Sequence, residues 1–292
     1  MLIASTAKNL HEALASTSTV PIASRTIICV PTMGALHEGH AALVRRARSW
    51  ANNNDPAALV VVTIFVNPTQ FNDPADLQRY PRTLDADCTL CEAAGADAVL
   101  CPSVEEVYPP NAPPKPSDSE LPAVATAPKL EDARRPGHFA GVYQVVRRLF
   151  ELTRCRRAVF GEKDWQQLQL VRAMVQQLNL SIHIDPAPTI RESDGLAMSS
   201  RNRFLSPTER AVAPAVYRAM QAAQRTNSIA DAERTMRETL QHAGLDVEYA
   251  VAREAQSLMP ITTSTSTDRA SVRLLIAAKL GSIRLIDNAP WG

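Results

Sequence analysis

Two histidines three residues apart, His37 and His40, lie in the segment PTMGALHEGH (31–40). The preceding run, 26–30, is short, apolar and rich in β-branched residues, which favours a strand. Apolar residues at helical spacing then predict a helix from Ala41 to about Trp50. The start of a helix offers free backbone N–H groups and a positive dipole end, which attract phosphate. The pair therefore points to phosphate chemistry.

Two other interpretations of the histidine pair stay open. Each histidine could be a solvated or structural residue, and the pair could be half of a zinc site. Zinc needs a third ligand, and no Cys or His follows at a convincing spacing, so we expect no metal site. The segment is neither Gly-x-Gly-x-x-Gly nor a lysine-bearing P-loop, so neither of those phosphate-binding mechanisms is indicated.

The positioning elements are alternating strands and helices up to about residue 185. A continuous apolar run at 58–66 is typical of a strand buried on both faces of a parallel sheet. Short strands are expected at 98–101 and 158–160, and helical periodicity fills 142–153 and 164–178. This alternation predicts an α/β fold with a doubly wound parallel sheet. Residues 109–128 hold seven prolines and are predicted to be an irregular loop or lid rather than a core element.

The pattern changes after Pro186 and Pro188. A capping box at 206–209 begins a helix, and a second helix is expected from Ile229 to Ala243. Strand-like segments follow at 247–252, 272–278 and 283–286. We therefore expect two domains, an α/β domain over 1–188 and a smaller C-terminal α+β domain over 189–292.

Three of the expected strands end in polar sequence, and in open α/β sheets ligands bind beyond the carboxyl ends of the strands. The histidines follow the first strand, Gln70 follows the second, and Lys163 and Gln167 follow the strand at 158–160. These side chains should share one crevice. A further segment, 194–202, offers two hydroxyls followed by an arginine, a combination that suits phosphoryl oxygens.

Composition narrows the class of protein. The 292 residues carry 31 basic and 30 acidic side chains, a balance that implies no nucleic-acid partner. Five cysteines without a regular framework suggest a reducing compartment, and Cys88 and Cys91 are interpreted as structural thiols. No apolar run is long enough to span a membrane, and the first 25 residues are a poor targeting signal. We expect a cytoplasmic protein.

At these residues the chain closely resembles the pantothenate synthetase family, also called pantoate–β-alanine ligase. The resemblance runs from Met1 to the C-terminus. The matching segments are PTMGALHEGH (31–40), IFVNPTQF (64–71), RYPRTLDAD (79–87), RPGHFAGV (135–142), VFGEKDWQQL (159–168), RESDGLAMSSRNRFLSPTER (191–210) and RLIDN (284–288).

The resemblance implies a Rossmann-like nucleotidyltransferase domain of the His-x-x-His superfamily over 1–188, which binds the nucleotide and pantoate. It further implies a smaller C-terminal α+β lid domain over 189–292 and a homodimer. It also implies a reaction in two steps with MgATP as a substrate. Pantoate attacks the α-phosphorus of ATP to give pantoyl adenylate and pyrophosphate, and the amine of β-alanine then displaces AMP to give pantothenate. Because the substrate carboxylate attacks directly, catalysis rests on alignment and charge stabilisation.

Site residues are carried over from the family by position. His40 corresponds to the family's proton donor, and His37, Lys163 and Arg201 supply further positive or donor groups. Gln70 and Gln167 match the amides that hold pantoate, and Gln70 also reaches β-alanine. The ATP-binding positions are Met33, Gly34, His37, His40, Gly161, Lys163, Asp164, Ile190, Met198, Ser199, Ser200 and Arg201.

Two positions depart from the family pattern. Thr69 stands where the family usually has Met and should slightly narrow the apolar wall. Asp132 stands where the family usually has Gly and should add a negative charge near the loop that approaches the substrate. The contribution of Glu131 and Arg135 to the site depends on the effect of this charge. Two rival functions also remain: another nucleotidyltransferase of the superfamily, and a catalytically silent nucleotide-binding protein. The chain lacks the basic surface expected of a tRNA ligase, and it retains the histidines and Lys163.

Overall fold

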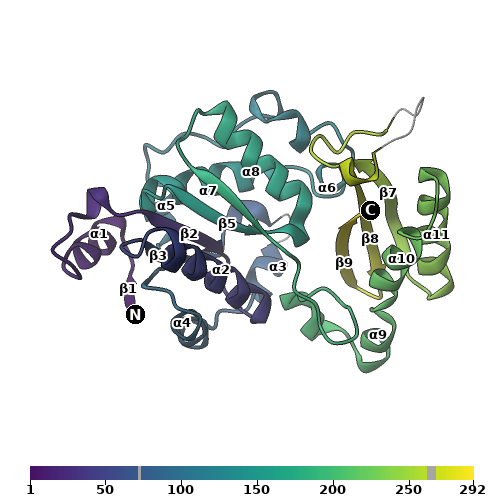
Figure 1. Cartoon of the computed structure of the whole chain (residues 1–292), viewed down its shortest axis with the longest axis horizontal. Coiled ribbons are helices and arrows are strands. Elements are labelled where there is room, and N and C mark those ends of the chain that lie inside the picture. The colour runs from purple at the N-terminus through teal and green to yellow at the C-terminus, as the bar shows by residue number, and fades with distance from the viewer. Residues whose placement is uncertain (72–73, 262–267) are drawn as a thin grey trace.

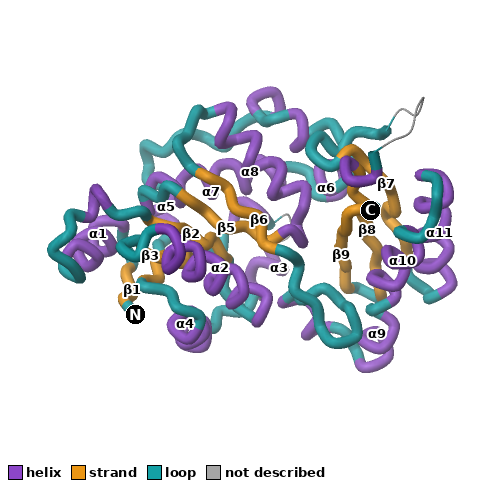
Figure 2. Tube along the Cα trace, in the orientation of Figure 1, coloured by secondary structure: helices purple, strands orange, loops and turns teal. Residues whose placement is uncertain are grey.

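The computed structural model describes residues 1–71, 74–261 and 268–292. They form a six-stranded parallel sheet with helices on both faces and a three-stranded antiparallel sheet with helices of its own (Figure 1 and Figure 2). The predicted fold class, an α/β sheet with a smaller α+β part, is confirmed. We call the two assemblies the large part and the small part.

The order of strands in the large part creates a single reversal point. Strand β2 lies between β3 and β5, so the chain winds outward from β2 in one direction and from β5 in the other. Ligands of doubly wound folds bind at such a point, beyond the carboxyl ends of the strands. The sheet order is β1-β4-β3-β2-β5-β6, with β1 Leu2–Ala4, β2 Ile27–Thr32, β3 Leu59–Ile64, β4 Ala98–Leu100, β5 Arg157–Gly161 and β6 His183–Ala187.

Alternate residues of the central strands supply two separate cores, because successive side chains point to opposite faces of a sheet. Ile27 and Cys29 pack with α1, α7 and α8, whereas Ile28 and Val30 pack with α2 and α4. Cys88 and Cys91 lie in α4 within the second core, and both are free thiols. The helices are α1 Ala7–Ala15, α2 Glu38–Asn54, α3 Pro74–Arg79, α4 Leu84–Ala93, α5 Val104–Val107, α6 Glu131–Arg134, α7 His138–Thr153 and α8 Trp165–Gln177.

Two features of the large part differ from the expectation. The proline-rich stretch 109–128 is irregular as predicted, but it is not excluded from the core, because Leu121, Val124 and Ala125 are buried against the sheet's helices. The edge strands β1 and β6 were not predicted. Strand β6 contains Pro186, which an edge strand tolerates because it has a neighbour on one side only.

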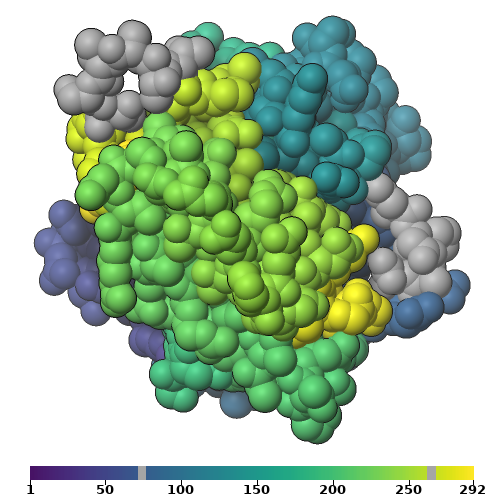
Figure 3. Space-filling model, turned by 90° about the vertical axis from the view of Figure 1, so that its right-hand side faces the viewer, coloured from purple at the N-terminus to yellow at the C-terminus, as the bar shows by residue number. Residues whose placement is uncertain are grey.

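The small part buries both faces of its sheet. Leu274 and Ile276 on β8 face α10 and α11, while Leu275 and Ala277 face the core of the large part. Figure 3 views the molecule from this side, where α9–α11 (green) form most of the visible surface. The elements are α9 Pro207–Val212, α10 Ala215–Ala223 (not predicted), α11 Ile229–His242, β7 Asp246–Glu254, β8 Val272–Leu280 and β9 Ile283–Pro290.

A partly buried ion pair joins the two parts. Arg284 on β9 donates to both carboxylate oxygens of Glu131 on α6, at 2.6 and 2.8 Å. The Tyr249 hydroxyl on β7 donates to the same carboxylate at 2.6 Å. Burial raises the pKa of Glu131, but hydrogen bonds and charge from Arg284 outweigh it, so the net pKa is lowered. Glu131 therefore stays ionised and holds β7 and β9 against α6.

A second buried carboxylate shapes the loop between β2 and the histidine helix α2. Asp87 on α4 accepts hydrogen bonds from the backbone N–H groups of Ala35 and Leu36 at 2.9 and 2.8 Å. Gly34 has a φ of 82°, and a Cβ there would lie 3.1 Å from Asp87 Oδ2. The turn therefore needs glycine for both conformation and space.

We expect Asp87→Ala to lower the free energy of unfolding by about 2–4 kcal/mol, because two buried N–H groups lose a charged acceptor. Urea denaturation at neutral pH measures this loss. The matched control is Asp85→Ala, in the same first turn of α4 but exposed, which should cost at most about 1 kcal/mol through the helix dipole. Equal losses for the two variants would contradict this role of Asp87.

Candidate active site

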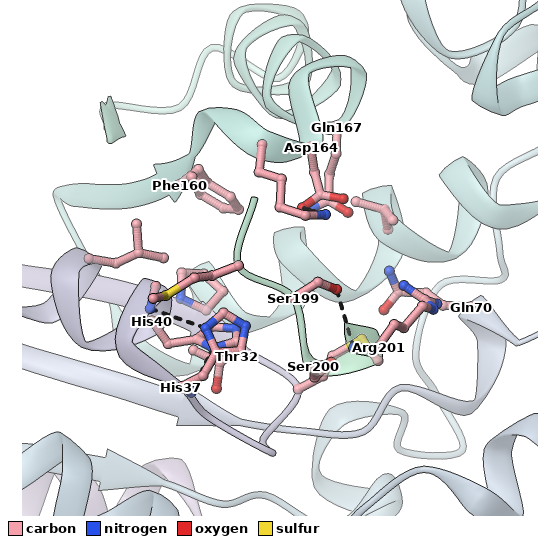
Figure 4. Close-up of a pocket in the computed structure, with 18 of the residues that line it drawn as sticks. Thr32, His37, His40, Gln70, Phe160, Asp164, Gln167, Ser199, Ser200 and Arg201 are labelled. Atoms are coloured by element: carbon pink, nitrogen blue, oxygen red, sulfur yellow. Dashed lines mark hydrogen bonds and ion pairs between the residues drawn. The ribbon is translucent and has the colours of Figure 1, made fainter. Parts of the chain in front are cut away.

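A pocket opens at the reversal point between β2 and β5. Its walls come from the ends of three strands, from α7 and from the segment that follows β6. Figure 4 shows His37 and His40 side by side at one end, Gln70 and Arg201 at the other, and Gln167 with Asp164 above them. Segments far apart in the sequence therefore meet in one cavity.

Nearly all the predicted site residues line this pocket. The exception is Gly34, which is buried in the turn beside Asp87 and does not reach the cavity. The predicted residues that line the pocket are Met33, His37, His40, Gln70, Gly161, Lys163, Asp164, Gln167, Ile190, Met198, Ser199, Ser200 and Arg201.

The two histidines cap the N-terminus of α2 with their own rings. His37 is the N-cap residue, and its Nδ1 accepts a hydrogen bond from the backbone N–H of Gly39 at 3.1 Å. The backbone N–H of His37 donates in turn to Nδ1 of His40 at 3.3 Å. Gly39 permits this arrangement, because a Cβ at that position would lie 2.8 Å from the His37 ring. The motif thus forms a capping box made of histidines.

This capping fixes the protonation of both rings. Because each Nδ1 accepts a hydrogen bond, the proton of the neutral ring sits on Nε2. Burial, with the neighbouring ring and Lys163, lowers the pKa of His40 to about 3. Burial and Lys163 also lower the pKa of His37. At neutral pH both histidines are therefore uncharged Nε2–H donors rather than cations.

Gln70 is the last residue of a short 3-10 turn, Pro68–Gln70, and the side chain of Asn67 holds this turn in place. Asn67 is fully buried, and its side chain caps the turn while its Nδ2 donates to the carbonyl of Gly141 on α7 at 3.3 Å. Thr69 does not line the pocket; its hydroxyl donates to Oδ1 of Asn67 at 3.0 Å. The expectation that Thr69 narrows the apolar wall is therefore wrong, and the residue instead helps to hold the turn.

Lys163 and Asp164 lie in the turn Glu162–Asp164 between β5 and α8. Lys163 Nζ is 3.9 Å from an oxygen of Asp164, whose side chain is about half exposed. Gln167 follows one turn later and faces the same cavity. A cation, a carboxylate and an amide thus come from one short segment beside the histidines.

Several pocket residues had no assigned site role in the sequence analysis, among them the polar side chains of Tyr80, Arg135 and His138. No described carboxylate lies within ion-pair distance of Arg135, and burial together with Arg201 lowers its pKa to about 10. Burial and Arg135 lower the pKa of His138 to about 3. The segment RPGHFAGV carried the signal for the last two, but the sequence does not show which of its residues face the cavity.

Asp132 does not bring negative charge into the pocket. Its carboxylate accepts hydrogen bonds from the backbone N–H groups of Lys129 and Leu130, at 3.0 and 2.7 Å, and from the Gln166 amide at 3.0 Å. Its charge therefore lies in the segment before Arg135, as expected from sequence, but it is used to fix the start of α6 and Asp132 does not line the pocket.

The pocket as a whole is suited to an anionic ligand with an apolar portion. Lys163, Arg135 and Arg201 supply positive charge, the two histidines supply neutral donors, and Phe160 belongs to an apolar wall. Among the described residues, no group of three or more His, Cys, Asp or Glu side chains could hold a metal ion. Nor does any helix in the described ranges have the length and apolar character needed to cross a bilayer.

Fold and pocket together define an α/β protein whose ligand site lies at the reversal point of a doubly wound sheet. Residues 2–290 match the family model described as pantoate-beta-alanine ligase. The pantothenate synthetase of Cereibacter sphaeroides is 46% identical over 288 residues, which cover 97% of this chain and 98% of the relative. That of a Nocardioides species is 48% identical over 266 residues, covering 89% of this chain and 77% of the relative.

Solved structures agree. The pantothenate synthetase of Thermus thermophilus superposes with a TM-score of 0.87 at 39% identity, covering 100% of this chain and 99% of that one. The ligase of Francisella tularensis, described as complexed with β-γ ATP and β-alanine, gives 0.77 at 31% identity, covering 100% and 98%. The chain belongs to the pantoate–β-alanine ligase family and is an enzyme of this type.

The protonation of His40 can be measured directly. We expect its ring in the free enzyme to stay neutral with the proton on Nε2 from pH 7 down to about pH 4, because burial lowers its pKa to about 3. Nitrogen-15 NMR of the labelled histidines, with His40→Gln to assign the signal, reports both tautomer and charge. A ring that takes up its second proton near pH 6.5 would show that the capped, neutral state is absent in solution.

Proposed function

We propose that this enzyme condenses pantoate with β-alanine through a pantoyl-adenylate intermediate, consuming ATP and releasing AMP and pyrophosphate. The observation that carries the proposal is the convergence of phosphate-binding groups and two side-chain amides in one pocket. The Francisella ligase, whose structure is described as a complex with β-γ ATP and β-alanine, supports the same substrates here.

The end of the pocket with the histidines suits the triphosphate. Two neutral Nε2–H groups at the start of α2 donate hydrogen bonds to phosphoryl oxygens. Lys163 and Arg201 supply the positive charge that balances the negative charge of the phosphates. Such preorganised donors stabilise charge that develops on phosphate as pyrophosphate leaves. In this proposal His40, His37, Lys163 and Arg201 are the catalytic groups. The ATP-binding set is the one expected from sequence, with Gly34 acting through the shape of the turn.

The amides and the apolar wall suit pantoate. This branched hydroxy acid carries two methyl groups on one carbon, which pack against the apolar side chains of α7 and the end of β5, including Val142, Val146 and Phe160. Gln70 and Gln167 then hold its hydroxyl and carboxylate oxygens. A carboxylate held in this way beside the α-phosphorus needs no protein nucleophile, because alignment alone gives a large rate gain.

In the second step the amine of β-alanine attacks the carbonyl carbon of the adenylate, and AMP leaves with the bonding electrons. Gln70 contacts β-alanine as well as pantoate in this proposal. Mg²⁺ enters with ATP as part of the substrate, since this ion is usually bound by phosphates and one or two carboxylates. Asp164 is the pocket carboxylate that would hold it, and the ion would neutralise phosphate charge.

Three further properties are proposed on the family resemblance. The chain functions as a homodimer, it works in the cytoplasm, and the boundary between its two domains falls near residue 188. The positions of the two sheets support the last point, because β6 ends at Ala187. Light scattering of the purified protein tests the first, and a molar mass of one chain would reject it.

The adenylate route predicts that β-alanine is needed only for the second step. Pantoate and MgATP alone should support exchange of labelled pyrophosphate into ATP, and omission of pantoate should abolish it. Exchange that strictly requires β-alanine would rule out the adenylate as an intermediate formed before the amine enters.

The two ends of the pocket should respond differently to substitution. Gln70→Ala or Gln167→Ala should weaken pantoate binding more than ATP binding, by about 1–3 kcal/mol, because a buried hydrogen-bond partner is lost. Arg201→Ala should act mainly on ATP, since a fixed guanidinium pairs best with phosphoryl oxygens. Calorimetric titration of each ligand measures the difference. A Gln70→Ala protein with intact pantoate affinity and weakened ATP affinity would show that this placement of the two substrates in the pocket is wrong.

A further inference from the structure

Strand β9 of the small part reaches the turn that carries Lys163. Asn288, on β9, is only 3% exposed. Its Nδ2 donates hydrogen bonds to the backbone carbonyls of Glu162 and Lys163, at 2.9 and 2.8 Å. Its Oδ1 accepts from Nε of Arg273 at 2.6 Å. Both amide hydrogens are therefore used on two consecutive carbonyls of the lysine turn, and the arginine fixes which way the amide faces.

Arg273, on β8, ties the same turn from its other side. Its guanidinium donates to a carboxylate oxygen of Glu162 at 2.9 Å and lies 3.6 Å from the centre of the Trp165 ring. The residue is 7% exposed, so these contacts are shielded from water. Glu162, directly before Lys163, and Trp165, two residues after it, are thus both in contact with the small part.

The lysine turn has little to hold it from within the large part. Neither the 3-10 turn Glu162–Asp164 nor the start of α8 has a side-chain cap. The pair between Lys163 and Asp164 is long, at 3.9 Å, and half exposed on the acidic side, so it adds little. The position of the lysine ammonium in the pocket therefore depends on the backbone, and the backbone depends on Asn288.

We propose that Asn288 is a positioning residue that acts through Lys163, so that the small part sets where the lysine of the large part lies. This inference rests on the proposed function of Lys163 in adenylate formation. It gives a role to the segment RLIDN (284–288), which the sequence analysis matched to the family without assigning any residue of it to the site. A displaced lysine lowers the rate of the first step, because misplacement by about 1 Å can cost up to about a hundredfold.

The test uses Asn288→Asp, which keeps the shape of the side chain and an acceptor for Arg273 but has no N–H to donate. We expect the turnover of pantoate-dependent pyrophosphate exchange to fall about tenfold or more. Asn288→Ala is the second variant, and thermal melting shows that each is folded at the assay temperature. The matched control is Gln224→Ala, which removes another amide-to-carbonyl hydrogen bond to strand β9, from Gln224 after α10 to the carbonyl of Pro290 at 2.8 Å, that does not reach the lysine turn. Its exchange should stay within about twofold of the unmodified enzyme.

A double-mutant cycle separates positioning from a general structural effect. Lys163→Ala alone should lower exchange about a hundredfold. In that background Asn288→Asp should cost less than about threefold, because the group it positions is already gone. An equal loss in both backgrounds, or no loss in the single variant, would overturn the inference. Failure of the proposed function would be visible earlier, as an unmodified enzyme that shows no pantoate-dependent exchange.

Discussion

The backbone N–H groups at the start of α2 donate to the Nδ1 atoms of His37 and His40, and much of the pocket depends on these two hydrogen bonds. They fix each ring, place its proton on Nε2 and keep it neutral in a buried position. A pair of protonated imidazoles 4.1 Å apart would repel each other beside Lys163. Neutral donors avoid that cost and leave the positive charge to side chains that are cationic at neutral pH.

The constraint on the histidines extends into the core. Asp87 shapes the turn before α2, and the absence of a side chain at Gly39 lets the His37 ring fold back over the helix start. The histidines and glycines of this motif are close in sequence, which explains why the segment 31–40 is recognisable from sequence. The residues that shape the turn, however, come from two different elements. Asp87 lies in α4, and its contact with the turn follows only from the packing of α4 beside α2.

The difference between local and non-local information explains what the sequence could predict. The continuous apolar run of β3 and the helical periodicities of α7 and α8 are patterns among residues close together in sequence. The bounds of these elements were therefore predicted to within a few residues. Three of the strand ends that form the pocket followed from the same reasoning. The burial of Leu121, Val124 and Ala125 did not, because it depends on contact with the distant helix α8 rather than on the proline-rich sequence itself.

Site residues divide in the same way. His37, His40 and Lys163 follow strands directly, so their shared location could be inferred from the sheet alone. Arg135 follows a four-residue helix, α6, whose place is set by the ion pair between Glu131 and Arg284 of the small part. The two partners are 153 residues apart in the chain, so neither residue indicates from the sequence that the other is its partner. The cationic side of the pocket therefore could not be completed from sequence.

The small part packs on the core of the large part through apolar residues of β8, and it reaches the segments that carry pocket residues through polar contacts. Glu131 with Arg284 fixes the segment before Arg135, and Asn288 with Arg273 holds the turn of Lys163. The segments that carry two cations of the pocket, Arg135 and Lys163, are thus both held by one antiparallel sheet, whose strands β8 and β9 pair in continuous register. In the proposed reaction, which uses no protein nucleophile, the rate depends on how accurately charge is placed around the phosphate. Because one sheet outside the six-stranded sheet holds the segments of both Arg135 and Lys163, the relative positions of these two cations depend on how the small part docks on the large part.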